Sequence, residues 1–182
     1  MSQSSPLGIS GVSLTASHNS RDSRGNFIKY TPDNFFVESL DSVAVSINPQ
    51  VGTIRGIHFQ VAPFAEEKII SCIQGSSFEV IIDLRPDSPT YGQTSTFELS
   101  EENFLQVYLP KGVAHGFQTL VPNTIIHYCL TSKYSPLNSY SINPIGDIEI
   151  SWPMKDTRIS EKDRLGMSFG EAAQVYADSL IQ

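Results

Sequence analysis

Two histidines lie in short segments whose residues could form a catalytic site. His58 lies in Arg55-Gly-Ile-His-Phe-Gln60, and His115 lies in Pro110-Lys-Gly-Val-Ala-His-Gly-Phe117. An imidazole ring titrates near neutral pH, so a rigidly held histidine can remove a proton from a carbon atom. The competing interpretation of His58 is a strand histidine that hydrogen-bonds to a neighbouring group. We therefore take His58 as a candidate general base.

Two arginines precede glycines in a way that suits an anionic ligand. Arg24 is followed by Gly25, and Arg55 by Gly56. A guanidinium fork matches phosphate oxygens, and a glycine lets a ligand approach the backbone, although a tight turn also explains each glycine. The net charge of −7 and the pI near 5.0 argue against broad binding to nucleic acid. They allow one anionic small molecule, because a diphosphate needs only two or three local arginines.

The elements that must position these residues have the pattern of short strands. Segments rich in β-branched and aromatic residues are separated by Pro, Gly, Asn and Asp turn signals. The expected strands are residues 43–47, 53–60, 68–73, 78–84, 94–99, 105–109 and 124–131. Short strands at this spacing predict an all-β sandwich, jelly roll or barrel. Helical periodicity occurs only at the end, where Ser168-Phe-Gly-Glu171 has the pattern of a capping box.

Length and composition indicate one globular unit. The 182 residues suffice for one sizeable domain, and we predict a single domain over residues 1–182, with a core at about 22–153 and a helical tail at about 160–182. The apolar runs are strand-sized and the start of the chain has no apolar core, so we expect no membrane span and no secretory signal. Cys72 and Cys129 sit in apolar runs and are expected to be buried, reduced thiols. Together these features predict a soluble, cytoplasmic protein.

Further segments, taken in order, are typical of one family. Asp83-Leu-Arg-Pro-Asp-Ser-Pro-Thr90 and Tyr128-Cys-Leu-Thr-Ser-Lys-Tyr-Ser-Pro136 join the two histidine segments, and Trp152-Pro153 and Ile159-Ser-Glu-Lys-Asp163 follow. From about residue 22 to residue 163, the chain resembles the dTDP-4-dehydrorhamnose 3,5-epimerase family. The resemblance implies a cupin double-stranded β-helix, or jelly roll, with short C-terminal helices and usually paired as a homodimer. Residues 83–90 are expected to form a structural turn without chemistry.

The resemblance implies an epimerase that acts on a nucleotide-linked 4-keto-6-deoxy sugar. His58 matches the family's catalytic base, and Asp163 matches the aspartate that orients this base. Lys68 matches the lysine that faces the sugar's C4 oxygen, and Tyr128 matches the tyrosine that acts as the acid. Removing a proton beside a ketone requires a base, stabilisation of the enolate oxygen, and an acid across the ring. The product would serve a surface polysaccharide such as O-antigen lipopolysaccharide, or another deoxysugar pathway.

Each catalytic assignment competes with a structural interpretation. The segment Ser160-Glu-Lys-Asp163 also has the pattern of a helix start with serine as its cap. Lys68 follows two glutamates, as a solvated lysine often does, and a strand tyrosine such as Tyr128 is often a packing residue. The second ring nitrogen of His58 needs a partner, which favours its pairing with Asp163.

The resemblance also implies a set of contacts with the substrate. The family arginines that bind the diphosphate match Arg24 and Arg55. The full set of predicted substrate-binding residues is Arg24, Phe27, Arg55, Gln60, His115 and Tyr134. The expected partners are therefore a nucleotide-diphosphate sugar and a second copy of the chain, with no nucleic acid and no membrane.

A metal site is not expected. The counterpart of His115 is a ligand in metal-binding cupins, and their first signature contains His-x-His. Here Phe59-Gln60 follows His58, so one histidine ligand is missing. Glu66 or Glu67 could supply a carboxylate, but the set remains poor for a divalent metal. We predict no metal and no organic cofactor.

Three departures from the family pattern bear on specificity. Apolar residues in Val43-Ala-Val-Ser-Ile-Asn48 replace a Gln-x-Asn pair that touches the substrate in the family. Lys29 stands where an acidic residue near the nucleotide base is common, and residues 138–151 lack the usual Trp-x-Asp-Pro. These departures leave open the sugar, the nucleotide and the number of carbons epimerised. We expect action at one carbon, C3 in preference to C5.

Three alternative functions compete with epimerisation. A related cupin ketoisomerase would move the keto group from C4 to C3, but Lys68 and Tyr128 at the family positions argue against it. A non-catalytic sugar-nucleotide-binding relative would be expected to lose His58 or Asp163, and both are present. A metal-dependent cupin oxygenase would hold a metal that analysis of the purified protein would detect.

Overall fold

A five-stranded antiparallel sheet forms one side of the molecule. The computed structural model describes residues 7–30 and 39–181, so the start of the chain, where no secretory signal is expected, lies outside the described residues. The sheet runs in the order β1 (Ser13–Ala16), β9 (Leu105–Leu109), β6 (Lys68–Gln74), β11 (Thr124–Leu130) and β4 (Ser42–Asn48). Within the described residues, β4 lies at the edge of this sheet and pairs with β11 alone.

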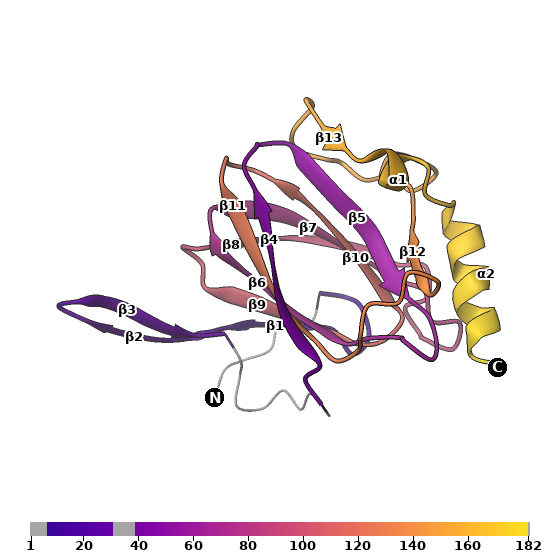
Figure 1. Ribbon diagram of the computed structural model, residues 1–182, viewed down its shortest axis with the longest axis horizontal. Helices are drawn as coiled ribbons and strands as arrows, with labels where there is room; N and C mark the ends of the chain where they lie inside the picture. Colours follow the sequence, from indigo (N-terminus) through magenta and orange to yellow (C-terminus); the bar gives the residue numbers. More distant parts are fainter. Residues whose placement is uncertain (1–6, 31–38, 182) are drawn as a thin grey trace.

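A six-stranded sheet faces the first one (Figure 1). Its order is β12 (Ser139–Ser141), β5 (Thr53–Gln60), β10 (Val113–Thr119), β7 (Ser76–Asp83) and β8 (Thr94–Ser100), with β13 (Arg158–Ile159) pairing in parallel with β5. From β4 to β12 the chain crosses between the sheets at every step except the β7–β8 hairpin. The predicted all-β jelly roll is therefore confirmed. Each of the seven strands expected from the sequence is present.

Alternating apolar residues fill the space between the sheets. Ile70 and Ile126 of the five-stranded sheet are buried with Ile81 and Phe117 of the six-stranded sheet in one core. Successive side chains of a strand point to opposite faces of the sheet, so every second residue of β7 faces away from the space between the sheets. These outward residues form a second core with the C-terminal helix, which explains why β10, the strand between β5 and β7, is buried along its whole length.

A β-bulge in β5 decides which of its side chains face inward. On β10, His115 pairs with His58 and Phe117 pairs with Arg55, so three steps on β5 oppose two steps on β10. Gly56 lies inside this bulge with φ 108, and a Cβ at this position would lie 2.7 Å from the Cα of Gly116. Glycine is therefore needed for the close approach of the two strands. The bulge brings Arg55 and His58 to the same side of the sheet.

Two short helices follow the strands. α1 (Glu161–Arg164) begins at the cap Ser160, and α2 (Phe169–Ser179) begins at Ser168 with the predicted capping box to Glu171. Ala172 and Tyr176 of α2 pack on the outer face of the six-stranded sheet (Figure 1). No helix within the described ranges is long and apolar enough to cross a membrane.

A two-stranded arm projects from the body of the molecule. β2 (His18–Asp22) and β3 (Gly25–Lys29) pair with each other in a separate sheet, and nearly all of their residues are exposed (Figure 1). An isolated two-stranded ribbon is marginally stable in water. We therefore expect the arm to be stabilised by packing against another surface.

The segment 83–90 forms a structural turn, as its sequence indicated. Asp83 is fully buried, and its carboxylate accepts hydrogen bonds from the guanidinium of Arg85 and from the hydroxyls of Ser88 and Thr90. Burial alone would raise the pKa of Asp83, but these hydrogen bonds outweigh burial and lower it from 3.8 to about 2. The ionised carboxylate thus closes the connection between β7 and β8.

Replacing Asp83 by Asn should destabilise the fold without touching the cavity described below. We expect the free energy of unfolding to fall by about 2–4 kcal/mol, because Arg85 would lose its buried counter-charge. The depressed pKa places the stabilisation above pH 4, and it is lost as the pH falls towards 2. Urea unfolding at pH 7 and at lower pH measures both effects. Asp87→Asn, an exposed change in the same turn, is the control, and an equal effect of both variants would contradict this account.

Candidate active site

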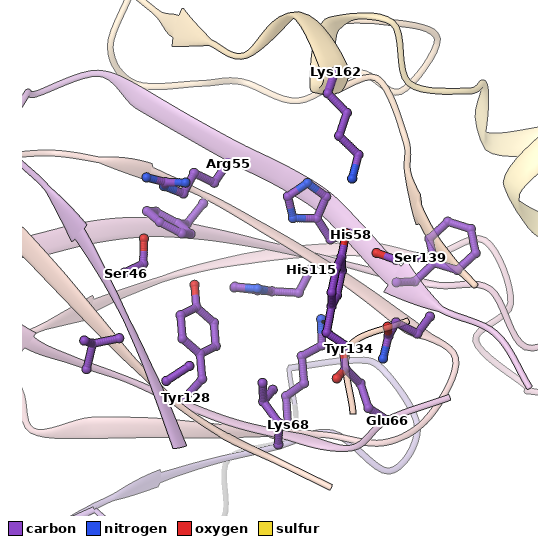
Figure 2. A pocket seen from close by; sticks show the side chains of 16 residues that line it. Ser46, Arg55, His58, Glu66, Lys68, His115, Tyr128, Tyr134, Ser139 and Lys162 are labelled. Atoms are coloured by element: carbon purple, nitrogen blue, oxygen red, sulfur yellow. Dashed lines mark ion pairs between the residues drawn. The ribbon is translucent and has the colours of Figure 1, made fainter. Parts of the chain in front are cut away.

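A cavity of about 500 Å³ lies between the two sheets. Strands β4, β5, β6, β10 and β11 contribute to its wall, together with the loop that contains Tyr134 and with Lys162 of α1 (Figure 2). Seven of the ten predicted site residues line it: Arg55, His58, Gln60, Lys68, His115, Tyr128 and Tyr134. The fold therefore gathers residues from four strands and one loop around a single space.

His58 and Asp163 form a short hydrogen-bonded pair at the wall. Nε2 of His58 donates to Oδ1 of Asp163 at 2.6 Å, and 41% of the His58 side chain is exposed against 6% of the Asp163 side chain. We assign the proton to Nε2 because the carboxylate can only accept. Nδ1 of His58 then carries a free lone pair, as a base requires.

Asp163 is held from several directions. Its Oδ1 accepts from the hydroxyl of Ser141 at 3.0 Å, its Oδ2 accepts from the backbone N–H of Gly56 at 3.4 Å, and its own N–H donates to Ser160 at 3.1 Å. Burial alone would raise the pKa of Asp163, but hydrogen bonds from His58, Ser141 and Ser160, with the charge of His58, lower it to about 2. The segment therefore combines a capped helix start with a hydrogen bond to His58, so the two interpretations do not exclude each other.

A second imidazole pair lies deeper in the fold. Nε2 of His115 donates to Glu79 at 2.6 Å, and the hydroxyl of Ser77 donates to the other oxygen of the same carboxylate. Both partners are buried, and burial lowers the pKa of His115 although the hydrogen bond to Glu79 opposes this shift. The ring of His115 meets that of Tyr128 edge-on, with the ring centroids 6.3 Å apart.

Tyr128 faces His58 from the opposite sheet. It comes from β11 of the five-stranded sheet, while His58 comes from β5 of the six-stranded sheet, and the two side chains point into the same cavity (Figure 2). Burial raises the pKa of Tyr128 well above its usual range, so its phenol stays protonated at neutral pH. The cavity thus presents the imidazole of His58 on one side and a phenolic O–H on the other.

Two cations in the cavity have contrasting partners. Nζ of Lys68 forms an ion pair with Oε1 of Glu66 at 3.2 Å, and each side chain is only 10% exposed. Nε of Arg55 instead donates to the neutral amide oxygen of Asn48 at 2.8 Å. Arg55 therefore keeps an uncompensated positive charge at the cavity.

Gln60 lines the cavity with its amide already engaged. Its side-chain N–H groups donate to the carbonyls of Phe64 and Lys133, and its oxygen accepts from the N–H of Ser135. These bonds hold the backbone on both sides of Tyr134, whose side chain is 66% exposed at the cavity. In the free protein Gln60 therefore positions the loop that carries Tyr134.

Arg24 and Phe27 do not join the cavity of their own chain. Both lie on the arm, around a separate hollow formed by residues 20–22 and 24–27. Arg24 pairs with Asp22 at 2.6 Å, and Phe27 is 67% exposed. Neither residue lines the cavity to which the other predicted substrate-binding residues contribute.

The wall contributed by β4 consists of small side chains. Ala44 pairs with the inward residue Tyr128 across the ladder, whereas Val45 pairs with His127. Ala44, Val45 and Ser46 line the cavity, and Val43 does not. Val43, Val45 and Ile47 alternate with Ala44 and Ser46 and are 57%, 54% and 61% exposed, so the apolar residues of this strand lie mainly on its outer face, and Val45 also borders the cavity.

Several residues at or beside the cavity were not among the ten predicted site residues. Glu66 precedes Lys68 by two residues, which is the spacing that places two side chains on one face of an extended segment. Lys162 adjoins Asp163 and points into the cavity (Figure 2). Glu79 had a clear signal, since it is a lone carboxylate between Phe78 and Val80 within an apolar strand. Within residues 7–30 and 39–181, no three His, Cys, Asp or Glu side chains group as metal ligands.

Comparisons with known proteins place the chain in a family. Residues 6–171 match the sequence profile described as dTDP-4-dehydrorhamnose 3,5-epimerase. A dTDP-4-dehydrorhamnose 3,5-epimerase of Sinorhizobium fredii is 39% identical over 166 residues, which cover 86% of this chain and 84% of the relative. A dTDP-4-dehydrorhamnose 3-epimerase of Streptomyces niveus is 30% identical over 176 residues, which cover 92% and 84%.

A solved structure has the same architecture. NovW, a 4-keto-6-deoxy sugar epimerase from the novobiocin biosynthetic gene cluster of Streptomyces spheroides, superposes with a TM-score of 0.88 at 29% sequence identity. The superposition covers 98% of this chain and 96% of NovW. With the sequence profile matched over most of its length, the chain belongs to the dTDP-4-dehydrorhamnose 3,5-epimerase family.

Proposed function

We propose that the protein epimerises a nucleotide-linked 4-keto-6-deoxy sugar at C3, at C5 or at both, the carbons that flank the C4 ketone. The observation that carries the proposal is the placement of His58 and Tyr128 on opposite sheets around one cavity, with Lys68 beside them. Inversion at carbon needs a base and an acid on opposite faces of the ring. The named relatives include both a 3,5-epimerase and a 3-epimerase, so the number of carbons is left to experiment.

His58 acts as the base in this mechanism. Its Nε2–H is bound by Asp163, so Nδ1 accepts the proton from the carbon next to the ketone. The electron pair of the broken C–H bond moves into the ring and onto the C4 oxygen, which becomes an enolate. Asp163 remains ionised and stabilises the imidazolium that forms.

Lys68 and Tyr128 complete the reaction. The ammonium of Lys68 donates a hydrogen bond to the C4 oxygen as negative charge develops there. The phenol of Tyr128 then gives its proton to the same carbon from the opposite face, and the ketone re-forms with the configuration inverted. Solvent reprotonates Tyr128 and deprotonates His58, so each turnover exchanges the carbon-bound proton. Every step uses side chains of the chain itself, and the proposal needs no metal or organic cofactor.

The diphosphate binds at the uncompensated cations. Three basic groups of the cavity have carboxylate partners: His58 with Asp163, His115 with Glu79, and Lys68 with Glu66. Among the described residues, neither Arg55 nor Lys162 has a carboxylate within ion-pair distance. A dianionic group is attracted to these two side chains, which lie on the same side of the view in Figure 2. The sugar then points towards Lys68 and Tyr134.

A second copy of the chain completes the site. The exposed arm needs a surface to cover it, and the edge strand β4 offers the exposed Val43, Val45 and Ile47 beside the cavity. An arm that packs there brings Arg24 and Phe27 of one copy to the cavity of the other. We therefore propose a homodimer in which Arg24 reaches the diphosphate and Phe27 the nucleotide base.

The setting of the reaction is also part of the proposal. Cys72 and Cys129 are free and buried, which is compatible with a reducing cytoplasm. The product is a deoxysugar nucleotide for a surface polysaccharide or a similar glycosylated product.

Incubation with dTDP-4-keto-6-deoxyglucose in heavy water tests the function. Proton NMR should show deuterium and inversion at C3, C5 or both. His58→Asn should slow this exchange about 10²–10⁴-fold, because the base is lost. His127→Asn is the matched control, since His127 lies one residue from Tyr128 on the outer face of β11 and should retain exchange. Migration of the keto group to C3, or exchange at the wild-type rate in His58→Asn, would overturn the proposal.

Mixed dimers test the contribution of the arm. One chain carries His58→Asn, and the other carries Arg24→Glu with Phe27→Ala. Each homodimer should have little activity, but co-expression should restore roughly a quarter of wild-type activity, because half of the dimers are mixed and each holds one intact site. Restoration requires that the arm acts on the other chain's cavity. Full activity of the arm variant alone, or no restoration on mixing, would contradict the shared site.

A further inference from the structure

Glu66 is a carboxylate inside a cavity that is proposed to accept an anionic substrate. Its side chain is 10% exposed, and it lines the cavity between Lys68 and Tyr134 (Figure 2). Burial of an isolated carboxylate is costly, and a negative charge repels a diphosphate. Such a residue needs a compensating role.

The ion pair to Lys68 supplies that role. Oε1 of Glu66 lies 3.2 Å from Nζ of Lys68, and among the described residues this is the one ion pair of Lys68. His115, His58 and Tyr128 also border the cavity around Lys68, and none of them offers a carboxylate. Glu66 is therefore the group that balances the buried ammonium.

A lysine has a long, flexible stem, so its ammonium must be held if it is to act at one atom. Fixing such a side chain in one position costs rotamer entropy. The ion pair with Glu66 offsets this entropy loss when the protein folds. The ammonium is therefore already in place when the enolate forms. Donors arranged in advance in this way stabilise a transition state without reorganisation during the reaction.

We propose that Glu66 is a positioning residue for catalysis, which holds the ammonium of Lys68 at the C4 oxygen of the sugar. The inference rests on the proposed epimerase function. It assigns Glu66 an effect on the enolate-forming step that passes entirely through Lys68. Glu66 itself gains and loses no proton.

The test compares two neighbouring glutamates. Glu66→Gln removes the charge that faces Lys68, and Glu67→Gln is the control, because Glu67 accepts from the hydroxyl of Tyr108 instead. With dTDP-4-keto-6-deoxyglucose as substrate, Glu66→Gln should lower kcat about 10–100-fold while KM changes less than about threefold. Glu67→Gln should match the wild type. A kcat of Glu66→Gln within about twofold of wild type, or a loss confined to KM, would overturn the inference.

A double-mutant cycle separates positioning from a general structural effect. In a Lys68→Met background, Glu66→Gln should cause no further loss of kcat, because the residue through which it acts is absent. An additional loss similar to that in the wild-type background would overturn the inference. A wild-type protein that fails to exchange protons at all would refute the proposed function instead, so the two failures are distinguishable.

Discussion

The orientation of His58 and the position of α1 depend on one buried carboxylate, that of Asp163. Asp163 joins β5 through His58 and Gly56, β12 through Ser141, and the first turn of α1 through Ser160. A helix of four residues has no stability of its own, so α1 exists where these contacts hold it. The C-terminal segment and the orientation of the base are therefore coupled. Disturbing one disturbs the other.

The jelly roll can place an acid and a base on opposite faces of a sugar ring, as inversion at a carbon atom requires. Its sheets face each other (Figure 1), so an imidazole on β5 and a phenol on β11 approach one cavity from opposite directions. The basic groups of the same cavity differ in whether a carboxylate balances them. His58, Lys68 and His115 are balanced by carboxylates, while among the described residues Arg55 and Lys162 have no carboxylate partner. In the proposed mechanism, geometry serves the proton transfers and charge orients the substrate.

Local patterning was enough to predict much of the fold, while the resemblance to the family implied the function. Strands with turn signals at both ends were found where expected, as was the capping box at Ser168. β10 was not expected as a strand, because a strand buried on both faces lacks the alternation that a half-buried strand shows. The bulge at Gly56 and the ion pair of Glu66 depend on contacts between strands, which spacing alone does not reveal.

The most direct test of the central claim is the rate of carbon–proton exchange in Asp163→Asn. An amide can no longer stabilise the imidazolium of His58, so exchange of a 4-keto-6-deoxy sugar nucleotide in heavy water should fall at least about 100-fold. Binding of dTDP should persist, because Arg55 is held by Asn48. Circular dichroism confirms that the variant is folded. Exchange near the wild-type rate in a folded Asp163→Asn protein would contradict the account.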